Sequence, residues 1–100
     1  PPSTLSHYVT AKHALWGLVK SLASEYANKC VRINAVSPSM IETKFLSNIN
    51  EKAVELSAYN HPLKRNALPS DVVPAIKLLL SDDSSYINGA NLPVTGGSIF

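Results

Sequence analysis

The apolar residues in the first third of the chain follow a helical period. Within residues 8–28 they recur at spacings of three and four, which places them on one face of a helix. This stripe consists of Leu15, Leu18, Val19, Leu22 and Tyr26. Trp16 and Val9 lie off the stripe. Because a helix that is apolar on two sides is buried on two sides, the pattern predicts that this helix covers a sheet and also meets a second surface.

A short strand and a loop are predicted next. Residues 31–36, Val-Arg-Ile-Asn-Ala-Val, include β-branched side chains and favour a strand that Pro38 stops, so that residues 37–43 form a loop at its carboxyl end. A helix, a tight turn and a strand in this order indicate an α/β fold. Ligands of open α/β sheets bind outside the carboxyl ends of the strands. We therefore expect the functional site near this loop.

Residues 44–66 are polar and irregular around a predicted short helix at residues 50–58. We expect its inward side chains to be Ala53, Val54 and Leu56, and the His61-Pro62 pair to end it. Such an excursion is typical both of a mobile lid over a site and of an ordinary surface loop.

A second amphipathic helix is predicted at residues 70–81, followed by a short strand at residues 91–94. Two starts of the helix are possible: Ser70 as N-cap, or Leu68 as N-cap with Pro69 as the first helical residue. We favour Ser70, because the other start leaves Pro74 fully inside the helix. The proline at position 93 favours a strand at or near a sheet edge.

Composition narrows the classes of function. The chain has 100 residues, of which 45% are hydrophobic and 16% charged, with a net charge of +2. The nine Lys and Arg are scattered, so no nucleic-acid surface is expected. No apolar run is long enough to cross a bilayer. The single cysteine, Cys30, has no partner for an internal disulfide, which favours a reducing, cytoplasmic setting.

Candidate chemistry begins with Tyr8 and Lys12, which are four residues apart and so share one helical face. Free tyrosine titrates at pH ~10, and a nearby ammonium favours its charged form. The pair is a candidate general acid and base, although the same spacing is common on exposed helices. Three histidines lack metal-ligand spacing, and we interpret them as solvated or turn residues. They are His7, His13 and His61.

Four motifs in a fixed order then resemble a known family. They are Tyr8-x-x-x-Lys12, the Arg-Ile-Asn-Ala-Val-Ser-Pro run at residues 32–38, Thr43 five residues later, and the Ile-Asn-Gly-Ala-Asn-Leu-Pro-Val-Thr-Gly-Gly run at residues 87–97. Together they resemble the carboxyl-terminal part of the short-chain dehydrogenase/reductases, over the whole chain. The resemblance implies an α/β fold that forms the carboxyl-terminal portion of a Rossmann-like doubly wound parallel sheet.

The resemblance also implies roles for individual residues and a cofactor, NAD(H) or NADP(H). Tyr8 would exchange a proton with the substrate, and Lys12 would hold the nicotinamide ribose beside it. The remaining cofactor contacts would be Pro38, Ser39, Ile41 and Thr43. The substrate contacts would be Met40, Phe45 and Leu46. Residues 42–66 would form the substrate-binding loop or lid.

The implied activity interconverts a ketone and a secondary alcohol, on a small-molecule or acyl-carrier-bound substrate. A 3-oxoacyl-carrier-protein reductase-like substrate and a sugar or polyol both fit. The alternative is a non-catalytic dinucleotide-binding or assembly subunit on the same scaffold. Two departures from the family pattern leave room for it: Ser39 replaces the usual glycine, and Thr95 replaces the usual aspartate.

The family's catalytic serine and glycine-rich loop would fall before Pro1. We therefore expect residues 1–100 to be the carboxyl-terminal fragment of a single NAD(P)-binding Rossmann-fold domain, inactive alone. The resemblance further implies a homo-oligomer with contacts through the 8–28 helix and the 70–94 region.

Overall fold

The structure is a computed structural model of the chain, and it describes residues 6–42 and 51–98. Its elements are the helices α1 (Ser6–Tyr26), α3 (Glu51–Asn60) and α4 (Pro69–Leu80), the 3-10 helices η1 (Ala27–Lys29) and η2 (Asp82–Ser84), and the strands β1 (Ala35–Pro38) and β2 (Asn91–Val94). The predicted first helix, short middle helix, second amphipathic helix and final strand are all present. None of the described helices is both long enough and apolar enough to span a membrane.

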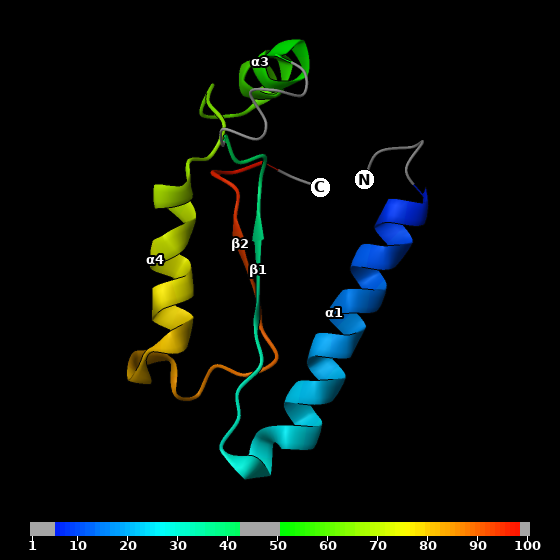
Figure 1. Cartoon of the computed structure of the whole chain (residues 1–100), viewed down its shortest axis with the longest axis vertical. Helices are drawn as coiled ribbons and strands as arrows, with labels where there is room; N and C mark the ends of the chain where they lie inside the picture. The colour runs from blue at the N-terminus through cyan, green and yellow to red at the C-terminus, as the bar shows by residue number, and fades with distance from the viewer. Residues whose placement is uncertain (1–5, 43–50, 99–100) are drawn as a thin grey trace.

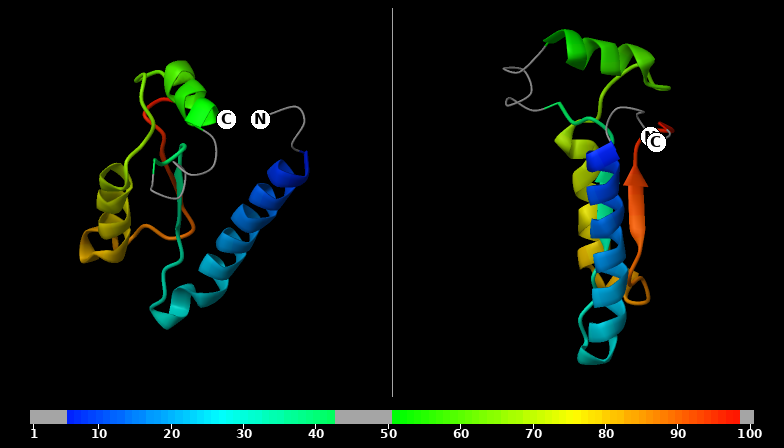
Figure 2. Two further views of the ribbon diagram at one scale, coloured as in Figure 1. Left: turned by 45° about the horizontal axis from the view of Figure 1, so that its top comes forward. Right: turned by 90° about the vertical axis from the view of Figure 1, so that its right-hand side faces the viewer.

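The two strands pair in parallel, with Ala35 opposite Asn91 and Pro38 opposite Val94. Figures 1 and 2 show α4 on one face of this sheet and α1 on the other, while α3 lies beyond the carboxyl ends of both strands. Helix α4 contacts both strands, as expected for the crossover between two parallel strands. In the described part of the chain β2 pairs with β1 alone, so it lies at an edge of this sheet.

The predicted strand at residues 31–36 is wrong in its bounds, because β1 begins only at Ala35. Before that residue one backbone bond remains, from the Gly89 N–H to the Ile33 carbonyl at 2.9 Å, and two side-chain amides make the neighbouring bonds. The Ile33 N–H donates to Asn88 Oδ1 at 2.9 Å, and the Ala90 N–H donates to Asn34 Oδ1 at 2.9 Å. Asparagine side chains therefore replace part of the backbone ladder ahead of β1.

The proline predicted to stop this strand is instead its last residue. The Ala35 N–H donates to the carbonyl of Ala90, just before β2, at 2.8 Å, and the Ser39 N–H donates to the carbonyl of Val94 in β2 at 3.2 Å. Alternate residues of a strand point their N–H groups to opposite sides. Position 38 therefore faces away from β2, and the N–H that Pro38 lacks is not needed for this pairing.

The favoured start of the second helix, with Ser70 as N-cap, is also wrong. Leu68 is the N-cap, Pro69 the first helical residue, and Pro74 lies inside the helix. Asp71 explains this start. Its carboxylate Oδ2 accepts the Leu68 N–H at 2.8 Å, while its own N–H donates to the Leu68 carbonyl at 2.8 Å. A carboxylate three residues into the helix satisfies the cap position, so no capping side chain is needed at the cap itself.

Little apolar surface is buried. The buried hydrophobic residues of the described chain are Ala23, Ala67 and Val72. The apolar stripe of α1 is open, with Leu15 59% exposed. On α3 the expectation of three inward residues holds only in part, because Val54 is half-buried whereas Ala53 and Leu56 are exposed. That helix lies beyond the strand ends rather than against a face of the sheet (Figure 1).

A single arginine joins the start of β1 to the end of α4. Arg32 Nη1 donates to the Leu79 carbonyl at 3.2 Å and to the carbonyl and hydroxyl oxygens of Ser84 at 2.7 and 2.9 Å. Its Nη2 donates to the Ser81 carbonyl at 3.2 Å. The last carbonyls of a helix lack partners within the helix and carry partial negative charge, so a guanidinium is well matched to them.

Arg32→Lys should therefore lower the free energy of unfolding by about 2 kcal/mol, because a lysine cannot reach several carbonyls with a planar fork. The measurement is urea denaturation followed by circular dichroism. Arg65→Lys is the matched control, since Arg65 lies on the surface, and it should cost less. Equal effects of the two substitutions would contradict the role assigned to Arg32.

The open apolar stripe of α1 generates a second prediction. Expressed alone, the 100-residue chain should self-associate, because contiguous apolar surface of this kind is rarely left in water. Replacing Leu15 and Leu18 with glutamate should shift the distribution toward monomer in sedimentation velocity. A compact monomer of the unmodified chain would show that the stripe needs no cover.

Candidate active site

Tyr8 and Lys12 occupy the first turns of α1 and lie together on one face, as their spacing predicts. The Lys12 ammonium nitrogen is 5.5 Å from the centre of the Tyr8 ring. Tyr8 is 50% exposed, so its phenol is accessible. The pair therefore presents to a ligand both the Tyr8 hydroxyl and the positive charge of Lys12.

The second group of predicted site residues follows β1. Pro38 ends the strand, and Ser39, Met40 and Ile41 lie just beyond its carboxyl end. A parallel bridge pairs Ile41 with Ala67, so this segment is tied to the residues that precede α4. Three further predicted residues lie outside the described residues: Thr43, Phe45 and Leu46.

The two groups are at the same end of the molecule but are not in contact. Figure 1 shows the N-terminal end of α1 level with the carboxyl ends of the strands and leaning away from the sheet. Among the described residues, no hydrogen bond, ion pair or ring contact joins Tyr8 or Lys12 to residues 38–41. Instead, the structure brings residues 38–41 together with residues 61–67 and the end of β2.

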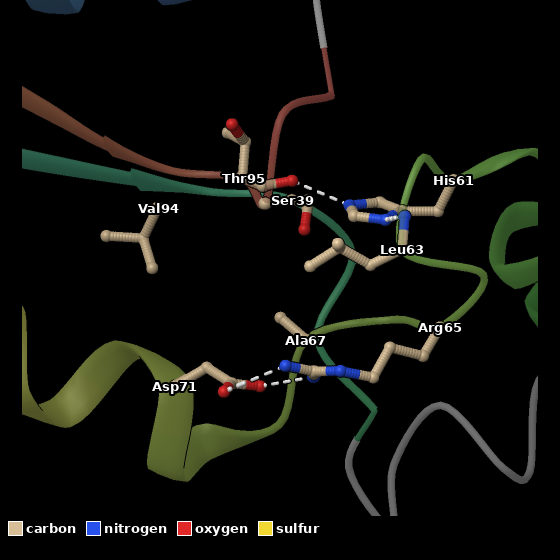
Figure 3. Close-up of a pocket in the computed structure, with 9 residues that line it drawn as sticks. Ser39, His61, Leu63, Arg65, Ala67, Asp71, Val94 and Thr95 are labelled. Atoms are coloured by element: carbon tan, nitrogen blue, oxygen red, sulfur yellow. Dashed lines mark hydrogen bonds and ion pairs between the residues drawn. The ribbon is translucent and has the colours of Figure 1, made fainter.

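A pocket of about 210 Å³ lies where these segments meet, on the α4 side of the strand ends (Figure 3). Ser39 and Thr95 line it from the strand ends, Leu63 and Arg65 from the segment before α4, and Asp71 from α4 itself. Its polar groups are largely engaged with one another. In the described part of the chain no set of three His, Cys, Asp or Glu side chains is placed to hold a metal ion.

His61 closes one side of this pocket. Its Nδ1 accepts the Leu63 N–H at 2.9 Å, so the ring proton is on Nε2, which donates to the Thr95 carbonyl at 2.6 Å. The ring lies in a turn, as expected, but at 8% exposure it is buried rather than solvated. Gly96 has a φ of +61°, and a Cβ there would lie 2.8 Å from the His61 ring. His61 therefore fastens the segment after α3 to the end of β2.

The Arg65–Asp71 ion pair forms the opposite side, with 2.8 Å between Nη1 and Oδ2 (Figure 3). The hydrogen bond from Arg65, and then the one from the Leu68 N–H, hold the pKa of Asp71 below its usual value. The same pair raises the pKa of Arg65. The carboxylate thus serves both the pocket wall and the start of α4.

Sequence reasoning missed the roles of His61 and of the buried Asn66, which reaches Glu42 from 24 residues away. The available signals were weak: a histidine beside a proline, and an asparagine one residue before an alanine in a polar stretch. The departure from glycine at Ser39 can be judged from its backbone angle. It is not among the described residues with positive φ, so this backbone does not require glycine.

Comparison with known proteins identifies the family. The family model described as Enoyl-(Acyl carrier protein) reductase matches residues 2–98. The chain is 41% identical over 93 residues to a cyclohexanol dehydrogenase of Acinetobacter sp. (strain SE19), covering 92% of this chain and 36% of that protein. It is 36% identical over 94 residues to a 3-oxoacyl-[acyl-carrier-protein] reductase of Rickettsia felis, covering 94% of this chain and 39% of that protein.

Solved structures agree with this assignment. An aldohexose dehydrogenase of Thermoplasma acidophilum, determined as a C-terminal deletion mutant, superposes with a TM-score of 0.77 at 37% identity, over 92% of this chain and 44% of that one. The chain belongs to the short-chain dehydrogenase/reductase family, and its α/β architecture is the carboxyl-terminal portion of the family's Rossmann-like sheet. It spans less than two fifths of the length of these curated relatives, at 36% and 39%.

The lowered pKa of Asp71 has a consequence for stability. A carboxyl whose pKa is lower in the folded state than in the unfolded state stabilises the fold. Its contribution is complete above the unfolded-state pKa, about 4, and is lost as the pH falls through the folded-state pKa. The unmodified protein should therefore be more stable than the Asp71→Asn variant at pH 7, and this difference in stability should shrink below about pH 4. Thermal denaturation across this range measures it. Asp83→Asn is the control, and a pH-independent difference for Asp71→Asn would contradict the prediction.

Proposed function

We propose that the protein containing this chain is an NAD(H)- or NADP(H)-dependent oxidoreductase that interconverts a ketone and a secondary alcohol. The observation that carries the proposal is the Tyr8–Lys12 pair on one exposed face of α1, with 5.5 Å between the ammonium and the ring. Membership of the short-chain dehydrogenase/reductase family supports the class of reaction, since the relatives named above are oxidoreductases by name.

In this proposal Tyr8 transfers a proton between its phenolic oxygen and the carbonyl or hydroxyl oxygen of the substrate. Negative charge develops on the phenolic oxygen when the proton leaves. The Lys12 ammonium stabilises that charge because it is held one helical turn away, on the same face. This is general acid–base catalysis by a tyrosine with a fixed cationic neighbour.

The residues after β1 fit the nicotinamide end of the cofactor. The Met40 carbonyl accepts the Ala67 N–H at 2.9 Å, and the Glu42 N–H donates to the Ala67 carbonyl at 2.8 Å. The N–H of Ile41, between them, therefore points away from Ala67, and no partner for it lies among the described residues. Ile41 supplies a backbone donor beyond Pro38 and Ser39, and Lys12 a donor for the ribose. When bound, the nicotinamide supplies or accepts the hydride.

For the substrate we propose a carbonyl compound that is either small or attached to an acyl carrier. Met40 follows the last residue of β1 by two positions. Helix α3 lies beyond the carboxyl ends of the strands (Figure 1), where a substrate reaching the nicotinamide would pass. This supports treating the 42–66 segment as the substrate-binding part of one Rossmann-fold domain. We also propose a homo-oligomer with contacts through α1 and residues 70–94, because Leu15 and Leu18 are exposed on α1 and Leu80 on α4.

Tyr8→Phe in the full protein should lower kcat by about 10²–10⁴-fold, because the phenyl ring keeps its packing but has no proton to transfer. The measurement is cofactor oxidation with a panel of ketones. Tyr26→Phe, at the other end of the same helix, is the matched control and should keep kcat within about twofold of the parent.

Equal rates for the parent and Tyr8→Phe would remove the assignment of Tyr8. A parent that binds the dinucleotide in calorimetry but turns over no ketone would instead favour a non-catalytic binding or assembly subunit. The two outcomes are separable because binding and turnover are measured independently.

A further inference from the structure

Asn66 is a buried polar residue whose amide nitrogen is hydrogen-bonded and whose amide oxygen is not. It is 4% exposed, and the two hydrogens of its amide go to different segments. Nδ2 donates to Glu42 Oε1 at 3.0 Å and to the Val54 carbonyl at 2.9 Å. Its Oδ1 is buried without a hydrogen-bond partner. Burying an unpaired acceptor is unfavourable, and an apolar side chain at this position would avoid that cost.

The backbone beside Asn66 joins the same segments. The Ala67 N–H donates to the Met40 carbonyl at 2.9 Å, and the Ala67 carbonyl accepts the Glu42 N–H at 2.8 Å. Asn66 and Ala67 together therefore connect the carboxyl end of β1, the middle of α3 and the segment that enters α4. We call this set of contacts the Asn66 clamp.

The clamp restricts geometry more tightly than apolar packing would. Glu42 Oε1 and the Val54 carbonyl are bonded to the two hydrogens of one planar NH₂ group, whose directions are fixed. Hydrogen bonds weaken steeply with misalignment, so a shift of α3 relative to Asn66 weakens the bond to the Val54 carbonyl. Apolar contacts, in contrast, are non-directional and would tolerate such a shift.

We propose that Asn66 is a positioning residue, which sets the place of α3 relative to residues 40–42 and thereby the KM for the carbonyl substrate. This inference rests on the proposed function, because it takes residues 40–41 as the nicotinamide and substrate end of the site. Asn66 makes no contact with Tyr8 or Lys12 in the structure, so it acts through Glu42 and α3 rather than on the reacting atoms. A displaced substrate wall raises KM, while the proton-transfer pair on α1 is untouched.

Asn66→Asp is the sharpest test, because it keeps the shape of the side chain but replaces the donating Nδ2 with an oxygen. That oxygen then faces two other acceptors, the Glu42 carboxylate and the Val54 carbonyl. In the full protein it should raise the KM for a ketone substrate about 10-fold and leave kcat within about twofold, while the KM for the dinucleotide rises by less than that for the ketone. Asn91→Asp is the matched control, since Asn91 Oδ1 only accepts, from Ser37 Oγ at 2.7 Å. It should leave all three constants near those of the parent.

A polarity swap separates positioning from general damage. In the double variant Asn66→Asp with Glu42→Gln, the glutamine amide can donate to the aspartate carboxylate and restore the bridge in the opposite direction. The KM should recover by about half of its logarithmic change. Glu42→Gln alone keeps the oxygen acceptor for Asn66 Nδ2, so its KM for the ketone should rise less than that of Asn66→Asp. Absence of recovery, or equal losses in kcat and kcat/KM, would overturn the proposal.

Hydrogen exchange gives a readout that does not need turnover. In Asn66→Asp the amides of Glu42 and Ala67 should exchange about 10-fold faster, while that of Ser39, bonded to the Val94 carbonyl at 3.2 Å, should not change. If the parent reduces no ketone, the proposed function fails, and this exchange pattern alone decides whether the clamp exists. Unchanged exchange at Glu42 and Ala67 would overturn it. Should Asn66→Asp fail to fold, Glu42→Leu removes one bond from an exposed side chain, and an unchanged KM would then contradict the role.

Discussion

The guanidinium of Arg32 is the interaction on which the described structure most depends. A parallel pair of strands needs a crossover whose helix ends beside the start of the first strand. Arg32 lies just before β1 and donates to the Leu79 carbonyl of α4 and to the carbonyl and hydroxyl oxygens of Ser84 in η2, a residue that is 1% exposed. Because few apolar side chains are buried here, this charged contact holds the crossover where a core would otherwise do so.

The same principle recurs at both ends of the sheet. Where the two strands begin, the amides of Asn34 and Asn88 hold the segments that enter β1 and β2. Where the strands end, His61 connects the segment after α3 to the end of β2, and Asn66 connects α3 to the segment after β1. Directional bonds from side chains to backbone groups therefore set both the strand register and the wall of the candidate site. The family motifs at residues 32–38 and 87–97 supply many of these bonds, through Arg32, Asn34 and Asn88.

Elements with a clear apolar period could be predicted from the sequence. This holds for α1 and α4, and the order of helix, turn and strand gave the α/β class. The short strand β2 was predicted at residues 91–94 without such a period. What the sequence did not reveal depends on partners distant along the chain. The start of β1 moved because asparagine amides replace ladder bonds. The cap of α4 moved because Asp71 caps from inside the helix. His61 and Asn66 act across 34 and 24 residues, and no local pattern indicates such contacts.

The candidate site divides into a half whose geometry is fixed within this chain and a half whose geometry is not. Residues 38–41 are held by β2, Ala67 and the Asn66 clamp. Helix α1 is held near its far end, where Asn88 Nδ2 donates to the Ala23 carbonyl at 3.0 Å and Gly89 packs on Ala23. Tyr8 lies more than three turns from that attachment. The proposed function requires Tyr8 to reach the same substrate and cofactor as Ile41. A surface that covers the exposed Leu15 and Leu18 would hold α1 in the position that this requires.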